Sequence, residues 1–247
     1  VPNKPHSLGT GPHPAARRAV ITLPCVLARR FSLMAVAAQG QERALRNVLC
    51  LHGYTQNADS FHKRLGAIRK VIKNANFVFV QAPFLTENGE DESSRTWWKT
   101  EEDGESVTYV GWEQSLAWLE ARDLEVGGFH GILGFSQGAA LGALVTAASA
   151  LKSRQLQWTV LVGGFPPRDP LCAKYLEEGA GNGTPKTLHV IGKDDKIVSP
   201  ERSRQLAALF GPGAQVFVHD KGHMIPSSVE FRTVLRTFID GEAAVEA

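Results

Sequence analysis

From Asn47 onward, short β-rich apolar runs alternate with longer segments of helical period. This alternation is typical of βαβ units, in which parallel strands form one sheet and helices cover its two faces. Helices are expected near residues 58–73, 112–124, 137–151, 201–210 and 226–239, and long loops near 83–110 and 165–185. The apolar runs predict strands over Asn47–Leu51, Phe77–Gln81, Gly131–Phe135, Trp158–Gly163, Thr187–Gly192 and Gln215–His219.

The segment Gly134–Gly138 has the pattern G-x-S-x-G, with Ser136 at its centre. An apolar strand is predicted before it and a helix of small residues after it, which is the context of a nucleophile elbow. The sharp turn strains the serine backbone and exposes its hydroxyl, and a Cβ on either glycine is expected to clash. An ordinary serine in a glycine-rich turn is the alternative. The flanking elements favour Ser136 as a nucleophile in an α/β-hydrolase fold with a mostly parallel sheet of about six or seven strands.

In this fold the acid follows the serine in the chain and lies in a loop at the end of a later strand. Asp194 and Asp195 both follow the strand that ends at Gly192. Asp195 is favoured, because the third residue after the glycine can turn back beneath the sheet edge while Ile197 and Val198 anchor the loop. Asp194 is expected to be solvated or to bond within the turn.

The histidine is expected in the loop after the last strand. His223 follows Gly222, which frees the backbone to bring the ring to Ser136. His219 lies at the end of the strand itself and is interpreted as structural. The predicted order is therefore Ser136, Asp195, His223.

The oxyanion hole is predicted to form from two backbone N–H groups, those of Tyr54 and Gln137. Gln137 follows the nucleophile, and His52-Gly53-Tyr54 closes the first strand, where α/β-hydrolases supply the second donor. The side chain of His52 is expected to hold this loop and not to act as a second base.

Together these motifs resemble the family of serine hydrolases found in fungi and animals, which includes the ovarian-cancer-associated hydrolases. The resemblance covers about residues 45–240 and departs at His130, where the family often has aspartate. It is carried by Leu49–Asn57, Trp97-Trp98, Gly131–Gly138 and Gly222-His223. The resemblance implies an esterase with a Ser-Asp-His triad, related to carboxylesterases and acyl-protein thioesterases.

The expected reaction is hydrolysis of carboxylic esters of hydrophobic acyl groups, with a small-molecule substrate and neither a metal nor another cofactor. Thioester cleavage, as by an acyl-protein thioesterase, uses the same elbow and is the first alternative. A non-catalytic receptor on the hydrolase fold is the second. The presence of Ser136, Asp195 and His223 argues against the receptor.

The insertion near 83–110 combines many acids with aromatic residues. Trp97 and Trp98 are expected either to line an acyl pocket or lid, or to attach the loop to the body. Phe84 and Phe165 follow strands at the serine edge of the sheet and are further pocket candidates. The acidity of the insertion argues mildly against a strongly anionic substrate.

Residues 1–40 differ from the rest, with five basic and no acidic side chains. They are predicted to be a disordered extension or a targeting segment preceding a domain over residues 41–247. The domain carries 22 basic and 25 acidic residues, which does not favour nucleic-acid binding. The sequence contains no apolar run long enough to suggest membrane insertion.

The three cysteines, Cys25, Cys50 and Cys172, show neither a disulfide framework nor metal-ligand spacing, and Cys50 is interpreted as a small core residue. We expect a cytoplasmic protein, or one in a plastid or mitochondrion if residues 1–33 are a transit peptide. The sequence leaves the oligomeric state open.

Overall fold

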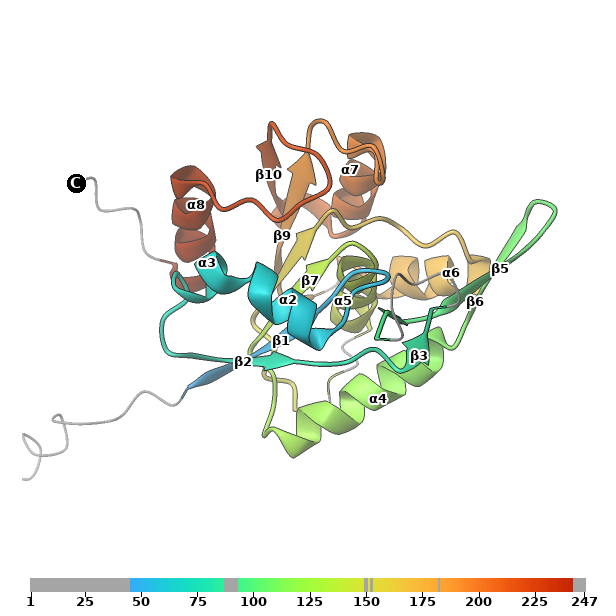
Figure 1. Ribbon diagram of the computed structural model, residues 1–247, viewed down its shortest axis with the longest axis horizontal. Helices are drawn as coiled ribbons and strands as arrows, with labels where there is room; N and C mark the ends of the chain where they lie inside the picture. The colour runs from blue at the N-terminus through green and yellow to red at the C-terminus, as the bar shows by residue number, and fades with distance from the viewer. Residues whose placement is uncertain (1–44, 87–92, 149–150, 152, 182, 242–247) are drawn as a thin grey trace, which may run out of the picture. The chain divides into compact units, whose positions relative to one another are not determined.

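The computed structural model describes residues 45–86, 93–148, 151, 153–181 and 183–241. Six parallel strands form one central sheet in the order β10-β9-β8-β7-β1-β2 (Figure 1). The predicted parallel α/β sheet is therefore confirmed, while the predicted extension over residues 1–40 lies outside the described residues. The strands are β1 (Arg46–Leu51), β2 (Ala75–Phe79), β7 (Gly131–Phe135), β8 (Trp158–Val162), β9 (Lys186–Gly192) and β10 (Gln215–His219).

Helices cover both faces of the sheet, and a separate apolar core lies between the sheet and the helices on each face. One face carries α2 (Ala58–Arg64), α3 (Gly66–Arg69) and α8 (Val229–Asp240), whose buried side chains include Phe61 and Phe231. The other carries α4 (Trp112–Glu125), α5 (Gln137–Ala147), α6 (Pro170–Gly179) and α7 (Pro200–Leu209). A 3-10 turn, η1 (Gly211–Gly213), follows α7. Within the described part of the chain, no helix is both long and apolar enough to cross a membrane.

The two predicted long loops contain regular structure that the sequence analysis missed. The first includes two antiparallel pairs, β3 (Phe84–Leu85) with β4 (Arg95–Thr96) and β5 (Lys99–Asp103) with β6 (Ser106–Val110). The second contains α6, which begins at Pro170 with Asp169 as its N-cap. The Asp169 carboxylate accepts hydrogen bonds from the N–H groups of Leu171 and Cys172. An N-cap aspartate followed by proline is a recognisable helix start, so this signal was available in the sequence.

The sequence after β7 allows α5 to pack unusually close to the sheet. A Cβ at Gly134 would lie 2.5 Å from the carbonyl oxygen of Gly138. A Cβ at Gly138 would lie 2.3 Å from the carbonyl oxygen of Leu51 and 2.4 Å from that of His52. The predicted need for glycine at both positions is confirmed, and the close packing brings the start of α5 beside the end of β1.

Replacing Gly138 with alanine is expected to lower the free energy of unfolding by about 3 kcal/mol or more, or to prevent folding. The new methyl group would meet backbone atoms of Leu51 and His52, which cannot rotate away as a side chain can. Urea unfolding measures the effect. Gly66→Ala is the matched control, because a Cβ there meets nothing within 4 Å. A Gly138→Ala protein as stable as the wild type would contradict the close packing.

Candidate active site

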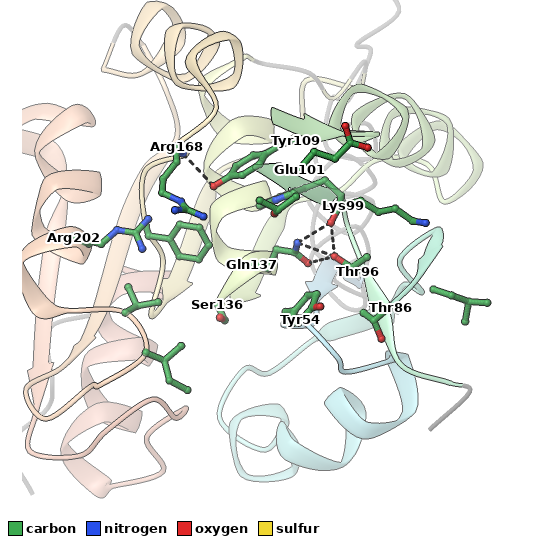
Figure 2. Close-up of a pocket in the computed structure, with 16 residues that line it drawn as sticks. Tyr54, Thr86, Thr96, Lys99, Glu101, Tyr109, Ser136, Gln137, Arg168 and Arg202 are labelled. Carbon is green, nitrogen blue, oxygen red and sulfur yellow. Dashed lines mark hydrogen bonds between the residues drawn. The ribbon is translucent and has the colours of Figure 1, made fainter. Parts of the chain in front are cut away.

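Ser136 occupies the turn between β7 and α5 in a strained backbone conformation. Its φ is 54° and its ψ is −119°, which side-chain-bearing residues rarely adopt. The residue is only 9% exposed, yet it lines a cavity and stands at the N-terminus of α5 (Figure 2). The helix dipole at this end stabilises negative charge near the serine. The predicted elbow geometry is therefore present at Ser136.

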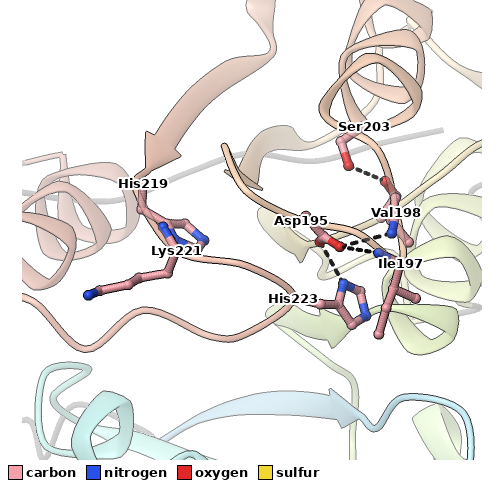
Figure 3. Close-up of polar contacts among 8 residues, drawn as sticks. Asp195, Ile197, Val198, Ser203, His219, Lys221 and His223 are labelled. Carbon is pink, nitrogen blue, oxygen red and sulfur yellow. Dashed lines mark hydrogen bonds and ion pairs between the residues drawn. The ribbon is translucent and has the colours of Figure 1, made fainter.

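The buried Asp195 forms a pair with the partly buried His223, shown in Figure 3. The Nδ1 atom of His223 lies 2.6 Å from Oδ2 of Asp195. The other carboxylate oxygen, Oδ1, accepts hydrogen bonds of 2.9 Å from the N–H groups of Ile197 and Val198. With both oxygens of Asp195 engaged, the imidazole is held in one orientation. Donation from Nδ1 to the carboxylate leaves the lone pair on Nε2, where a general base needs it.

The competing residues lie apart from this pair. Asp194 is exposed, and its backbone N–H donates to the carbonyl oxygen of Lys221. His219 is half-buried at the end of β10, where its Nδ1 accepts a hydrogen bond from the N–H of Lys221 at 3.3 Å. Burial lowers the pKa of His219. Of the two acids and two histidines considered from the sequence, the structure pairs Asp195 with His223.

The end of β8 determines how His223 approaches the serine. Since β8 lies between β7 and β9, the ring must cross its end from the loop after β10. The crossing point is Gly163, with φ +58°, where a Cβ would lie 3.0 Å from Cε1 of His223. The ring then packs on Phe135, the residue before Ser136, with 4.8 Å between the ring centroids. Gly163 is thus a requirement of the site that the sequence analysis missed.

The two predicted oxyanion donors lie at adjacent strand ends. Leu51 of β1 pairs with Gly134 of β7, so the loop after β1 reaches the serine turn. A Cβ at Gly53 would lie 3.3 Å from that of Ser136. Among the residues that the structure describes, neither the N–H of Tyr54 nor that of Gln137 has a hydrogen-bond partner. Both groups are therefore free to bind an oxygen of a substrate.

Gln137 is held in place by its side chain, a feature the sequence analysis did not foresee. Its Oε1 accepts hydrogen bonds from Oγ1 of Thr96 and the N–H of Trp97, both at 3.0 Å. Its Nε2 also lies 2.8 Å from Thr96 Oγ1 and 3.3 Å from the carbonyl oxygen of Trp98. The first insertion thus orients the residue that follows Ser136.

His52 has the structural role expected from the sequence. The ring is fully buried, with Nδ1 2.8 Å from the carbonyl oxygen of Gly53 and Nε2 accepting a hydrogen bond from the N–H of Ala82. Burial lowers the pKa of His52 to about 4, so the ring is neutral at pH 7. Both ring nitrogens are engaged, and neither can serve as a base.

A cavity of about 640 Å³ opens beside Ser136 and Gln137. Two of the four predicted pocket residues, Trp98 and Phe165, line it. Trp97 does not: it is fully buried, and its Nε1 donates to the carbonyl oxygen of His52 at 2.8 Å. Phe84 is also not among the lining residues, because its ring packs against Gly111. Of the two tryptophans, one attaches the insertion to the body and one faces the cavity.

Two further lining residues, Arg168 and Arg202, were not among the candidates considered from the sequence. Arg168 precedes α6 and Arg202 lies in the first turn of α7, and neither belongs to a motif. The full lining consists of Tyr54, Leu85, Thr86, Thr96, Trp98, Lys99, Thr100, Glu101, Tyr109, Ser136, Gln137, Phe165, Arg168, Ile197, Val198 and Arg202.

Comparison with other sequences places this chain in a known family. The family model described as "Serine hydrolase (FSH1)" matches residues 43–235. The chain is 34% identical to "Esterase OVCA2" of Danio rerio over 221 residues, which cover 78% of this chain and 95% of the relative. It is 31% identical to "Esterase OVCA2" of Homo sapiens over 229 residues, covering 81% and 97%.

Solved structures show the same fold at lower identity. Esterase PE8 superposes with a TM-score of 0.59 at 20% identity, covering 80% of this chain and 93% of that one. Acyl-protein thioesterase 2 of Zea mays gives 0.56 at 17% identity, covering 82% and 97%. The central sheet and the two helical layers are thus those of the α/β-hydrolase fold, and the sequence matches place the chain within one family. The chain belongs to the FSH1 serine hydrolase family.

Proposed function

We propose that this hydrolase cleaves carboxylic esters of hydrophobic acyl groups through an acyl-enzyme on Ser136, with His223 as base and Asp195 as its partner. One observation carries the proposal. The 2.6 Å contact to Asp195 occupies Nδ1 of His223, while the ring packs on Phe135 directly before the strained serine. The basic nitrogen is therefore Nε2, on the side of the imidazole away from the acid.

In the first step, Oγ of Ser136 attacks the ester carbonyl carbon while its proton passes to Nε2 of His223. The carbon–oxygen bond to the alcohol then breaks, and the alcohol takes that proton as it leaves. Water attacks the acyl-enzyme with His223 again as base, and the acid is released as Ser136 regains its proton. Asp195 stabilises the imidazolium formed in both halves of the reaction.

The developing oxyanion is assigned to the N–H groups of Tyr54 and Gln137. Their lack of another partner in the described structure supports the assignment. Donors fixed before the reaction stabilise charge without reorganising, and losing one typically costs about 10²–10³ in kcat. The anchored side chain of Gln137 serves this purpose by holding its backbone still.

The cavity supports an acyl group with substantial apolar surface. Trp98 stacks on Tyr109 with 4.9 Å between ring centroids, and Phe165, Leu85, Ile197 and Val198 add further apolar wall. Thioester cleavage uses the same steps with a thiol as leaving group and is the alternative to be tested. Ester hydrolysis is preferred because the relatives of Danio rerio and Homo sapiens are named esterases.

A fluorophosphonate probe tests the enzyme assignment, and we expect stoichiometric labelling of Ser136 identified by peptide mass spectrometry. A panel of p-nitrophenyl esters of increasing chain length, beside acyl-coenzyme A and a lipidated peptide, tests the substrate class. Esters should be turned over with the higher kcat/KM. Labelling of a different residue, or none, would contradict the proposed nucleophile, and preferential turnover of the thioesters would favour the alternative.

A further inference from the structure

Arg202 presents a half-buried guanidinium to the same cavity as Ser136. It lies in the first turn of α7, and its charged group sits over the ring of Phe165 at 4.8 Å from the centroid. Its Nη2 donates to the carbonyl oxygen of Pro166 at 3.3 Å. These contacts hold the guanidinium at the cavity wall and leave most of its donors available, because stacking on an aromatic ring uses its face and not its edge.

Among the described residues, Arg202 has no carboxylate partner. Its charged neighbour is another cation, Arg168, whose own side chain is paired with Glu102. Burial lowers the pKa of Arg202, and the proximity of Arg168 lowers it further, against an opposing effect of Tyr109. A cation that is partly desolvated and faces a like charge is stabilised when an anion binds beside it.

The other groups at this wall complement an anion as well. The Tyr109 hydroxyl accepts a hydrogen bond from the N–H of Arg168 at 3.1 Å and retains its own proton to donate. Figure 2 shows Tyr109, Arg168 and Arg202 together on one side of Ser136, with Tyr54 and Thr86 on the other.

The balance of charge around the cavity is positive. The lining includes Lys99, Arg168 and Arg202 but only one acid, Glu101. This excess of basic side chains in the lining differs from the expectation that the acidic insertion disfavours an anionic substrate. Glu102 is paired with Arg168, Asp103 and Glu105 are exposed near the tip of the β5–β6 hairpin, and Glu87, Glu90, Asp91 and Glu92 lie outside the described residues.

We propose that the substrate is an ester carrying a second, ionised carboxyl group, which Arg202 binds with help from Tyr109. The inference rests on the proposed ester hydrolysis and specifies its substrate class. A carboxylate fits the planar edge of a guanidinium, and the surrounding aromatic wall accommodates the apolar chain that joins this group to the ester. The charge lies either on the acyl chain or on the alcohol, and both sources present the same carboxylate to Arg202.

Matched substrates test the proposal. For charge on the acyl chain, p-nitrophenyl hemisuccinate, hemiglutarate and hemiadipate are compared with the butyrate, valerate and caproate. For charge on the alcohol, 4-butyryloxybenzoate is compared with its methyl ester. In at least one arm the charged ester should have the higher kcat/KM. Arg202→Gln should reduce the charged-to-neutral ratio about tenfold or more, and Arg202→Lys should retain part of it.

Arg204→Gln is the control, because this exposed arginine lies on the same helix outside the cavity lining and should keep the wild-type ratio. The preference should weaken as ionic strength rises. A ratio that Arg202→Gln leaves unchanged in both arms would overturn the proposal.

A binding measurement separates this inference from the proposed function. Calorimetry with Ser136→Ala and monomethyl glutarate, against methyl valerate, reports carboxylate binding without turnover. Binding of the charged ester that Arg202→Gln abolishes would support the anion site even if no ester were hydrolysed. Equal binding of the two esters, or binding that survives Arg202→Gln, would overturn it.

Discussion

Replacing Ser136 with alanine is expected to lower kcat/KM for p-nitrophenyl esters by about 10⁵-fold or more. The variant lacks the Oγ that forms the covalent intermediate, so neither His223 nor the oxyanion donors can restore the acyl-enzyme route. The substitution keeps the Cβ and therefore leaves the backbone strain at φ 54° unchanged. Steady-state kinetics measure the loss, and thermal unfolding should show a midpoint close to that of the wild type.

Ser227→Ala provides the matched control, since it removes the hydroxyl of an exposed serine in the segment before α8. It should leave kcat/KM within about twofold of the wild type, as expected for a surface change. If Ser136→Ala retained wild-type turnover, the nucleophile would be another residue. The fluorophosphonate adduct would then identify it.

Replacing Asp195 with asparagine is expected to reduce kcat by about 10⁴-fold. The asparagine Oδ1 can still accept hydrogen bonds from Ile197 and Val198, so its NH₂ group would face Nδ1 of His223. A donor there requires Nδ1 to be the acceptor and moves the ring proton to Nε2. The nitrogen to which we assign the role of base would then carry a hydrogen and could no longer take one.

Asp194→Asn is the matched control for this change. It makes the same substitution one residue earlier, on an exposed side chain outside the pair with His223. We expect kcat within about twofold of the wild type. Equal losses from both substitutions would point to a general disturbance of the loop, and a larger loss from Asp194→Asn would contradict the assignment of the acid.

The sequence alone identified the elements whose causes are local. The strand before Ser136, the glycines on either side and the small-residue helix after it lie within one short segment, so the strained turn was recognisable without any knowledge of distant contacts. The core strands were also predicted within two residues at each end, because six short apolar runs of strand length leave little choice of element.

Asp195 and His223 required one global assumption, that the serine, acid and histidine each follow a strand at the same sheet edge. Given that topology, spacing was sufficient to favour Asp195 over Asp194 and His223 over His219. The choice of Asp195 rested on its position three residues after Gly192. That Ile197 and Val198 donate hydrogen bonds to its carboxylate became visible only in the structure.

Only the tertiary structure decided which side chains face the cavity. Trp97 and Trp98 are adjacent in the bend between β4 and β5, yet one is fully buried on His52 and the other lines the cavity. When the neighbours of a loop are unknown, its sequence does not show which of two adjacent side chains faces the cavity and which is buried in the core.

The positions of Gly163 and Arg202 depend on neighbours still farther away in the chain. Gly163 must lack a side chain because the ring of His223 crosses it. Arg202 is held at the cavity wall by Phe165, with the like charge of Arg168 nearby. Local sequence therefore determined the strained turn at Ser136, since backbone strain arises between bonded neighbours. The shape and charge of the cavity were decided by packing, since they arise between segments that meet only after folding.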